Sequence, residues 1–305
     1  MSVAFPTGVW PVMLTPFTEN GEVDYLSLER LVHFYEQNGV SGLFAVCQSS
    51  EMFYLSLRER VEIVSFLKKV AHVPVIASGH TAWALSDQID EGKAVLDAGA
   101  DALILITNRL AQPSQSDAVW QRNLDTLLNA LPEDAPLGFY ECPYPYKRLL
   151  TQAQIDFCAQ SGRFYFLKDT CCDAARMRQR IDQIRGTSLQ LYNANNATLL
   201  DTLRMGCAGF SGVMANFHPD LFAWLCANYQ REPEKAQLLQ AGLTMCSQIE
   251  KQLYPVNAKT YLMQLGVFSS NFTRTRDAGE LTPLFVDEIR QMAVLADHLR
   301  GVIAR

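Results

Sequence analysis

The sequence is short of the features that mark membrane, secreted and nucleic-acid-binding proteins. No apolar run approaches the roughly 20 residues that span a bilayer. Residues 1–8 lack the basic stretch and apolar core of a signal peptide. Charged residues make up 19% of the 305 residues and the formal net charge is −6, so we expect no membrane and no nucleic-acid partner. One basic cluster, residues 176–185, is interleaved with apolar residues at helical spacing and predicts a solvated helix face.

Motifs for metals, nucleotides and serine nucleophiles are also missing. The eight cysteines are irregularly spaced without a CxxC pair, and the five histidines are scattered, so we expect no metal ion. Reduced cysteines fit a cytoplasmic protein. No GxGxxG follows the first apolar run and no GxSxG elbow exists, which argues against dinucleotide binding and serine hydrolysis.

Eight short apolar runs give the chain its organisation. Most are continuous rather than alternating, as expected of strands buried on both faces. Amphipathic stretches separate most of them; one opens with Ser56-Leu-Arg-Glu59, a capping-box pattern. Three segments share a design in which a helix stops at glycine, at Gly39, Gly99 and Gly206, just before a strand. The runs cover residues 9–17, 42–47, 74–78, 102–107, 137–142, 164–168, 189–193 and 210–215.

Eight strands alternating with helices predict a (β/α)8 TIM barrel, with an open doubly wound sheet as the alternative. The barrel would occupy residues 1–230. Beyond it the pattern turns helical, and residues 231–305 are expected to form a C-terminal helical extension packed on the barrel, without a Gly/Ser/Pro linker.

Reactive groups of such a barrel lie at the C-terminal ends of its strands. Lys168 ends the sixth run, directly after Phe164-Tyr-Phe-Leu167, and Tyr140 lies near the end of the fifth. On that segment alone, a lysine that reaches solvent is the simpler interpretation. Adjacent strand ends bring the two side chains together, however, and an aromatic floor of Phe164 and Phe166 would lower the amine's pKa by desolvation. A neutral amine can form a Schiff base with a carbonyl, and the phenol could move protons.

The other strand ends supply candidate substrate-binding side chains. Ser49 and Ser50 could cradle a carboxylate with hydroxyls and backbone N–H groups, although an ordinary turn would look the same. Other polar residues at strand ends are Gln48, Asn195 and Ser211. His80 is expected to be structural or solvent-facing, and Lys259 to be a surface lysine of a helix outside the barrel.

These residues belong to a set of motifs that resembles the dihydrodipicolinate synthase / N-acetylneuraminate lyase family of class I, Schiff-base aldolases. The resemblance runs from about residue 8 to about residue 266. It includes Gly8-Val-Trp-Pro-Val-Met-Leu-Thr-Pro-Phe17, Pro74-Val-Ile-Ala-Ser-Gly79, Gly99-Ala-Asp-Ala-Leu-Ile-Leu-Ile-Thr107, Phe139-Tyr-Glu-Cys-Pro143, Leu167-Lys-Asp169 and Pro255-Val-Asn-Ala-Lys259. It implies Lys168 as the imine-forming lysine and Tyr140 as the proton-relay tyrosine. It also implies a tetramer that acts on pyruvate or larger 2-oxo acids without metal or organic cofactor.

The chain departs from the family pattern around the second substrate. The family's Gly-Thr-Thr-Gly-Glu loop is Cys47-Gln-Ser-Ser-Glu51 here, so Gln48 replaces a threonine that relays protons in the synthase. The synthase's subunit-bridging tyrosine aligns near Leu110 and its substrate arginine aligns with Pro145. The acidic contacts of sialic acid lyases are missing around residues 193–196. The resemblance therefore implies a divergent member that is neither a dihydrodipicolinate synthase nor a sialic acid lyase.

Three functions remain open from the sequence. The first is a Schiff-base lyase or aldolase. The second is a dehydratase or deaminase of a 2-oxo acid that uses the same imine. The third is a non-catalytic binding protein on an inherited barrel.

Overall fold

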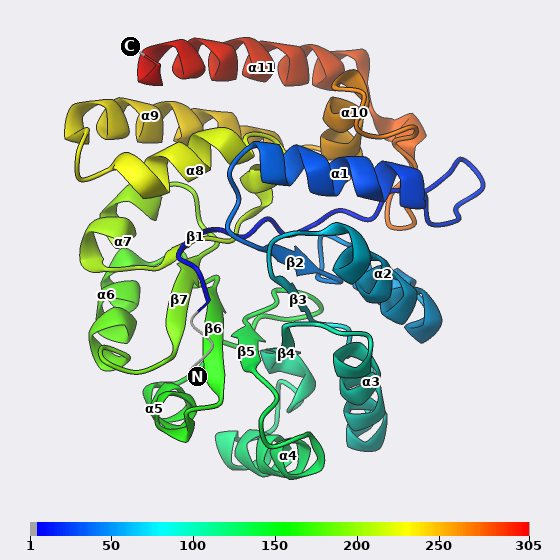
Figure 1. Ribbon diagram of the computed structural model, residues 1–305, viewed down its shortest axis with the longest axis vertical. Coiled ribbons are helices and arrows are strands. Elements are labelled where there is room, and N and C mark those ends of the chain that lie inside the picture. Colours follow the sequence, from blue (N-terminus) through cyan, green and yellow to red (C-terminus); the bar gives the residue numbers. More distant parts are fainter. Residues whose placement is uncertain (1–4, 305) are drawn as a thin grey trace.

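The chain folds into a ring of parallel strands surrounded by helices, as the computed structural model of residues 5–304 shows (Figure 1). Within those residues the eight strands are hydrogen-bonded in the order β1-β8-β7-β6-β5-β4-β3-β2. They are β1 (Gly8–Val9), β2 (Leu43–Ala45), β3 (Val75–Ala77), β4 (Ala102–Ile106), β5 (Leu137–Tyr140), β6 (Phe164–Asp169), β7 (Gln190–Asn193) and β8 (Gly209–Phe210).

The ring closes between the segment after β1 and β2. The Met13 N–H donates to the Phe44 carbonyl at 2.9 Å, and the Phe44 N–H donates to the Pro11 carbonyl at 3.0 Å. Val12 and Phe44 form the corresponding isolated parallel bridge. Because Pro11 has no N–H to donate, the first predicted strand is mostly irregular in its pairing and β1 itself stays short.

Helices follow the strands around the barrel (Figure 1). They are α1 (Tyr25–Gln37), α2 (Leu57–Val70), α3 (Leu85–Asp97), α4 (Asp117–Ala130), α5 (Gln152–Ser161), α6 (Ala174–Gln183), α7 (Leu199–Met205) and α8 (Pro219–Asn228). The predicted capping box is confirmed at α2, where the Ser56 hydroxyl accepts from the Glu59 N–H and Glu59 accepts from the Ser56 N–H. Gly39 and Gly206 take the positive φ angles, 76° and 105°, that end a helix before the next strand.

The C-terminal helices lie beyond α8 and α1, on one side of the barrel (Figure 1). They are α9 (Pro233–Cys246), α10 (Val256–Gln264) and α11 (Pro283–Ile303), with α9 packed between α8 and α11. The predicted fold, a (β/α)8 barrel with a C-terminal helical extension, is confirmed, whereas a division between two units at residue 230 stays a prediction. Among residues 5–304, no helix combines the length and apolar character needed to cross a bilayer.

Short 3₁₀ helices occupy several loops between these elements. They are η1 (Met52–Tyr54), η2 (Thr107–Arg109), η3 (Val213–Asn216), η4 (Ser247–Lys251) and η5 (Ala278–Glu280). The last predicted strand is therefore shorter than expected, because the chain leaves the sheet after Phe210 and turns into η3.

Aromatic side chains fill the barrel interior. Phe166 stacks on Tyr192 at a centroid distance of 4.2 Å and contacts Trp10 and Phe44 edge-on at 5.4 and 6.1 Å. Each of these four side chains is fully buried. The barrel interior is thus a packed core rather than a pore.

Candidate active site

A pocket of about 490 Å³ opens at the C-terminal ends of the strands. Its lining combines residues from the β2, β5, β6, β7 and β8 ends with residues from the C-terminal segment. The lining includes Gln48, Ser49, Glu51, Phe53, Tyr54, Tyr140, Tyr144, Lys168, Thr170, Ala194, Gly212, Val213, Tyr254, Pro255, Thr275 and Arg276.

Lys168 is buried at the inner end of this pocket, with 4% of its surface exposed. Its Nζ lies 4.2 Å from the centroid of the Tyr140 ring and 5.8 Å from that of Phe44. Desolvation lowers the pKa of the ammonium from its ordinary value of 10.5 to about 8, against weaker opposing effects of Cys47, Cys142 and Glu250. The amine therefore becomes neutral at a lower pH than an exposed lysine does.

The aromatic floor beneath Lys168 differs from the sequence prediction. The β5–β6 register shifts between Leu137 and Gly138, so Tyr165 is passed over in the pairing. Such an irregularity moves the residues on its two sides to opposite faces of the strand. Phe166 consequently shares the inward face with Lys168, whereas Phe164 stacks on Phe139 at 5.1 Å. The second ring of the floor is Phe44, from β2.

Tyr140 and Lys168 are register partners on the neighbouring strands β5 and β6, as the strand order predicts. Its hydroxyl donates to Gln48 Oε1 at 3.3 Å, and the Cys142 thiol points to the same oxygen at 3.4 Å. Burial raises the pKa of Tyr140 well above its ordinary value, with smaller contributions from Cys142 and Cys47. The phenol is thus held in its neutral, proton-donating form.

The loop after β2 lines the pocket through Gln48 and Ser49 and holds backbone donors without protein acceptors. Within residues 5–304, neither the Gln48 nor the Ser49 N–H donates to a protein acceptor. Val46 and Glu51, which flank the loop, have positive φ angles of 48° and 61°, and a β-branched residue rarely adopts this conformation. Backbone strain of this kind persists where the surroundings enforce it, often at functional sites.

Three predicted substrate-binding residues are not brought into the pocket. The Ser50 hydroxyl donates to the Met13 carbonyl at 2.6 Å and so ties the loop to the barrel wall. Asn195 Oδ1 accepts from the Thr198 backbone N–H, and Asn195 lines a smaller neighbouring cavity of about 240 Å³. Ser211 is fully buried and absent from the lining. Strand-end position alone does not decide where such side chains point.

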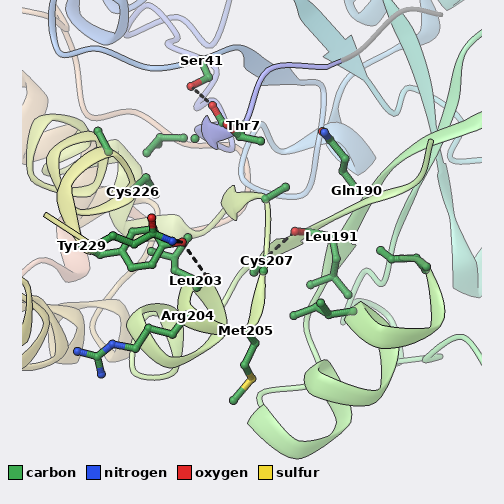
Figure 2. A pocket seen from close by; sticks show the side chains of 18 of the residues that line it. Thr7, Ser41, Gln190, Leu191, Leu203, Arg204, Met205, Cys207, Cys226 and Tyr229 are labelled. Atoms are coloured by element: carbon green, nitrogen blue, oxygen red, sulfur yellow. Dashed lines mark hydrogen bonds between the residues drawn. The ribbon is translucent and has the colours of Figure 1, made fainter. Parts of the chain in front are cut away.

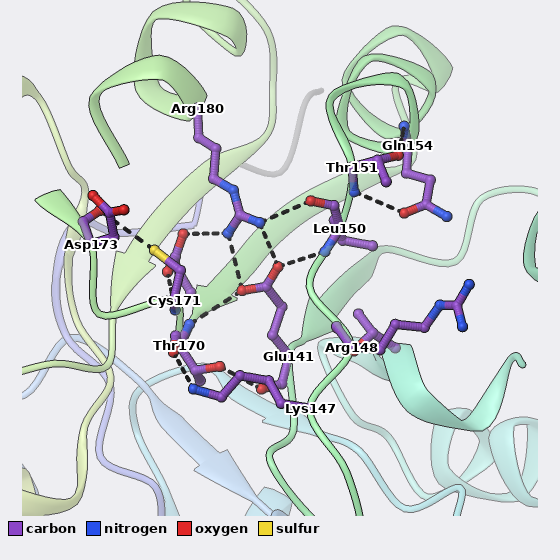
Figure 3. Close-up of polar contacts among 12 residues, drawn as sticks. Glu141, Lys147, Arg148, Leu150, Thr151, Gln154, Thr170, Cys171, Asp173 and Arg180 are labelled. Atoms are coloured by element: carbon purple, nitrogen blue, oxygen red, sulfur yellow. Dashed lines mark hydrogen bonds and ion pairs between the residues drawn. The ribbon is translucent and has the colours of Figure 1, made fainter. Parts of the chain in front are cut away.

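The prediction that residues 176–185 form a solvated face is wrong for Arg180. This side chain, 3% exposed, donates to Glu141 and to Asp169, which directly follow Tyr140 and Lys168 in the sequence (Figure 3). Glu141 also accepts from the backbone N–H groups of Leu150 and Thr170. Burial raises the pKa of Glu141 and Arg180 opposes this shift. The triad joins the ends of β5 and β6 and so fixes the separation of the phenol and the amine.

Lys259 is likewise buried rather than on the surface. Its Nζ donates to Glu51 at 2.7 Å and to the Phe272 carbonyl at 2.9 Å, and it lies 4.4 Å from the Phe17 ring centroid. Burial lowers its pKa to about 8 while Glu51 opposes the shift. Unlike Lys168, this amine is engaged in an ion pair, which makes it a poor nucleophile.

Sequence reasoning missed the C-terminal contribution to the site. Tyr254, Thr275 and Arg276 all line the pocket. Glu250, on η4, lines the smaller cavity; desolvation raises its pKa to about 7, and the Lys168 charge opposes the shift. The motif of residues 255–259 marked this region in the sequence, but nothing in it showed which loop would turn toward the barrel mouth.

A larger cavity of about 800 Å³ lies at the opposite end of the barrel (Figure 2). It is lined by the starts of β1, β7 and β8 and by the turns before them, including Thr7, Gln190 and Cys207. Lys168 and Tyr140 do not contact it. Within the described part of the chain, no group of three or more His, Cys, Asp or Glu side chains is arranged to hold a metal ion.

Comparisons with known proteins agree with this architecture. The model of the Dihydrodipicolinate synthetase family matches residues 5–282. A 4-hydroxy-tetrahydrodipicolinate synthase of Pseudoalteromonas atlantica is 28% identical over 275 residues, which cover 88% of this chain and 91% of that protein. An uncharacterized DapA-like lyase of Chloroflexus aurantiacus is 25% identical over 301 residues, 97% of this chain and 98% of that one.

Solved structures show the same fold. The crystal structure of the chloride-inhibited dihydrodipicolinate synthase from Acinetobacter baumannii, complexed with pyruvate, aligns with a TM-score of 0.85 at 23% identity. The alignment covers 95% of this chain and 99% of that one. The resemblance carried by the sequence motifs is confirmed, and the chain belongs to the dihydrodipicolinate synthetase family.

Proposed function

We propose that this protein is a class I lyase in which Lys168 forms a Schiff base with pyruvate or a larger 2-oxo acid. One observation carries the proposal. The Lys168 amine, which has no ion-pair partner among residues 5–304, lies buried in a pocket over aromatic rings, with its pKa lowered to about 8. A buried lysine without an ion-pair partner costs stability, and nucleophilic chemistry is the function that such an amine serves.

The surrounding groups fit the steps of imine formation. The substrate carboxylate would accept from the free N–H groups of Gln48 and Ser49, which places its carbonyl carbon toward Lys168. Tyr140, held neutral, would donate a proton to the oxygen that leaves as water. Gln48 accepts the phenol's hydrogen bond, but an amide does not titrate, so the proton relay would end at Tyr140 rather than continue through the loop.

The iminium then acts as an electron sink for cleavage or formation of the adjacent carbon–carbon bond. Elimination of water or ammonia through the same imine, as in a dehydratase or deaminase, is the second candidate. Gln48 supports this second candidate. Its amide does not titrate, so the step that follows imine formation would use a proton path that does not pass through Gln48. Product analysis with candidate 2-oxo acids distinguishes the two.

Synthesis of dihydrodipicolinate is not the activity that we propose. Leu110 is fully buried and cannot titrate, and Pro145 offers no positive charge. Those are the positions at which the resemblance implies a relay tyrosine and a substrate arginine.

The test is reductive trapping. The protein is incubated with pyruvate and with larger 2-oxo acids, reduced with borohydride, and digested for mass spectrometry. We expect an adduct on Lys168 and none in Lys168→Met, while Lys259 remains unmodified. Absence of an adduct with every 2-oxo acid tested would leave the third candidate, a non-catalytic binding protein on an inherited barrel.

We further expect a cytoplasmic homotetramer. Tyr54 and Tyr144, which line the pocket, are half-exposed, as is Trp83, and burial against another copy would stabilise these side chains. Sedimentation velocity would give the oligomeric state.

A further inference from the structure

The segment between α10 and α11 places an exposed arginine, Arg276, on the lining of the pocket. Arg276 lines the same cavity as Lys168, and its guanidinium makes no ion pair or hydrogen bond with any side chain or carbonyl among residues 5–304. Its neighbour Arg274 differs, because that side chain donates to Gly21, Tyr54 and Glu59. Arg274 therefore fastens the segment, whereas the Arg276 side chain is exposed on the pocket lining and has no protein partner in the described chain.

The backbone that carries Arg276 is fixed at several points. The Arg276 N–H donates to the Thr273 hydroxyl at 2.9 Å, and that hydroxyl donates back to the Arg276 carbonyl at 2.8 Å. Glu51 Oε2 accepts from the N–H groups of Arg274 and Thr275 at 2.6 and 3.0 Å. The guanidinium thus projects from an ordered support rather than from a loose loop.

The side chains that line the pocket itself carry an excess of positive charge. Glu250, whose charge acts on Lys168, lines the smaller neighbouring cavity instead. Among the lining residues, the charged side chains are Glu51, Lys168 and Arg276. Glu51 is buried and neutralised by Lys259, and its second oxygen is occupied by backbone donors. Asp277, next to Arg276, is engaged as the N-cap of η5 through the Gly279 N–H. No carboxylate of the lining is left to balance Arg276.

We propose that Arg276 binds a second carboxylate of the substrate, so that the pocket selects a 2-oxo dicarboxylate. This proposal rests on the proposed Schiff-base function. The first carboxylate and the oxo group would lie at the Gln48–Ser49 loop and Lys168, and the chain between the two ends would pass Val213, Tyr254 and Pro255. A planar guanidinium recognises a carboxylate through two parallel hydrogen bonds, which a neutral substrate end cannot reproduce.

The experiment compares acids matched in length. Borohydride trapping on Lys168 is measured over a concentration series at fixed ionic strength. The dicarboxylates 2-oxoglutarate and 2-oxoadipate are compared with the monocarboxylates 2-oxopentanoate and 2-oxohexanoate. Arg276→Gln is the test variant. Arg178→Gln is its matched control, because Arg178 is an exposed arginine of α6 without an ion-pair partner in the described chain.

In the wild type, we expect at least one dicarboxylate to reach half-saturation at a concentration about 10-fold to 100-fold below that of its monocarboxylate match. Arg276→Gln should remove most of that difference without changing the monocarboxylate values, and Arg178→Gln should change neither. Equal half-saturating concentrations for both classes in the wild type would overturn the proposal. So would an Arg276→Gln variant that weakens both classes alike. Failure of all four acids to form an adduct would instead overturn the Schiff-base function itself.

Discussion

Replacing Lys168 with methionine should make the protein more stable while abolishing its chemistry. The unfolded lysine binds a proton up to pH 10.5, whereas the folded one releases it above about pH 8. Between pH 8 and pH 10.5 the unfolded state binds more protons than the folded state, so the free energy of unfolding rises with pH there. Below pH 8 the buried ammonium of Lys168 destabilises the folded protein by its full amount. The shift corresponds to about 3 kcal/mol of lost stability at pH 7. Methionine has a similar length and no charge to desolvate.

Urea unfolding at fixed protein concentration measures this difference, since association would otherwise alter the midpoint. At pH 7 we expect the free energy of unfolding of Lys168→Met to exceed that of the wild type by up to about 3 kcal/mol, and the gain to vanish toward pH 10.5. Lys259→Met is the matched control. Its pKa is also lowered to about 8, but its removal leaves Glu51 buried without a cation, so it should lose about 3–5 kcal/mol. A Lys168→Met variant that is less stable than the wild type at pH 7, or whose difference is independent of pH, would refute the desolvation argument.

Three further predictions concern the site. The initial rate of imine formation with pyruvate, measured by rapid quenching with borohydride, should rise with pH to a midpoint near 8 rather than above 10. Glu250→Gln should move that midpoint to a lower pH, because the Glu250 carboxylate stabilises the Lys168 ammonium. An unchanged midpoint would contradict the coupling of Glu250 to Lys168. Tyr140→Phe should slow trapping about 100-fold or more while the half-saturating pyruvate concentration stays nearly constant; equal effects on both would indicate a packing role. Arg180→Met should cost about 3–5 kcal/mol in urea unfolding at pH 7. That loss should shrink as pH falls, because Glu141, whose pKa burial already raises, can then be buried neutral; a pH-independent loss would argue against the ion triad.

The barrel and its central pair were predictable because they depend on local patterns. Continuous apolar runs mark strands that are buried on both faces, and the glycines that end helices fix where each strand begins. Once the strands are numbered, the rule that reactive groups follow them places Tyr140 beside Lys168. That adjacency follows from topology alone.

The remaining features depend on contacts between distant segments. Glu51 and Lys259 are 208 residues apart, and Glu141 and Arg180 are 39 apart. A charged residue predicts exposure unless its partner is known, so both Arg180 and Lys259 were expected to face solvent. Phe164 was assigned to the wrong face for a different reason, because a single irregularity in strand pairing reverses the alternation and leaves no mark in the composition.

Because Glu51 anchors the C-terminal segment, the pocket is built from two separate stretches of the chain. The amine and phenol come from residues 140–168, while Tyr254, Thr275 and Arg276 come from residues after 250. A change in the later stretch can alter the lining of the pocket without touching Lys168 or Tyr140, provided that Glu51 and Lys259 are kept to dock it. Under the proposed function, we expect exchange of residues 250–282 between relatives to give chimaeras that share one reaction and differ in the substrates that they accept.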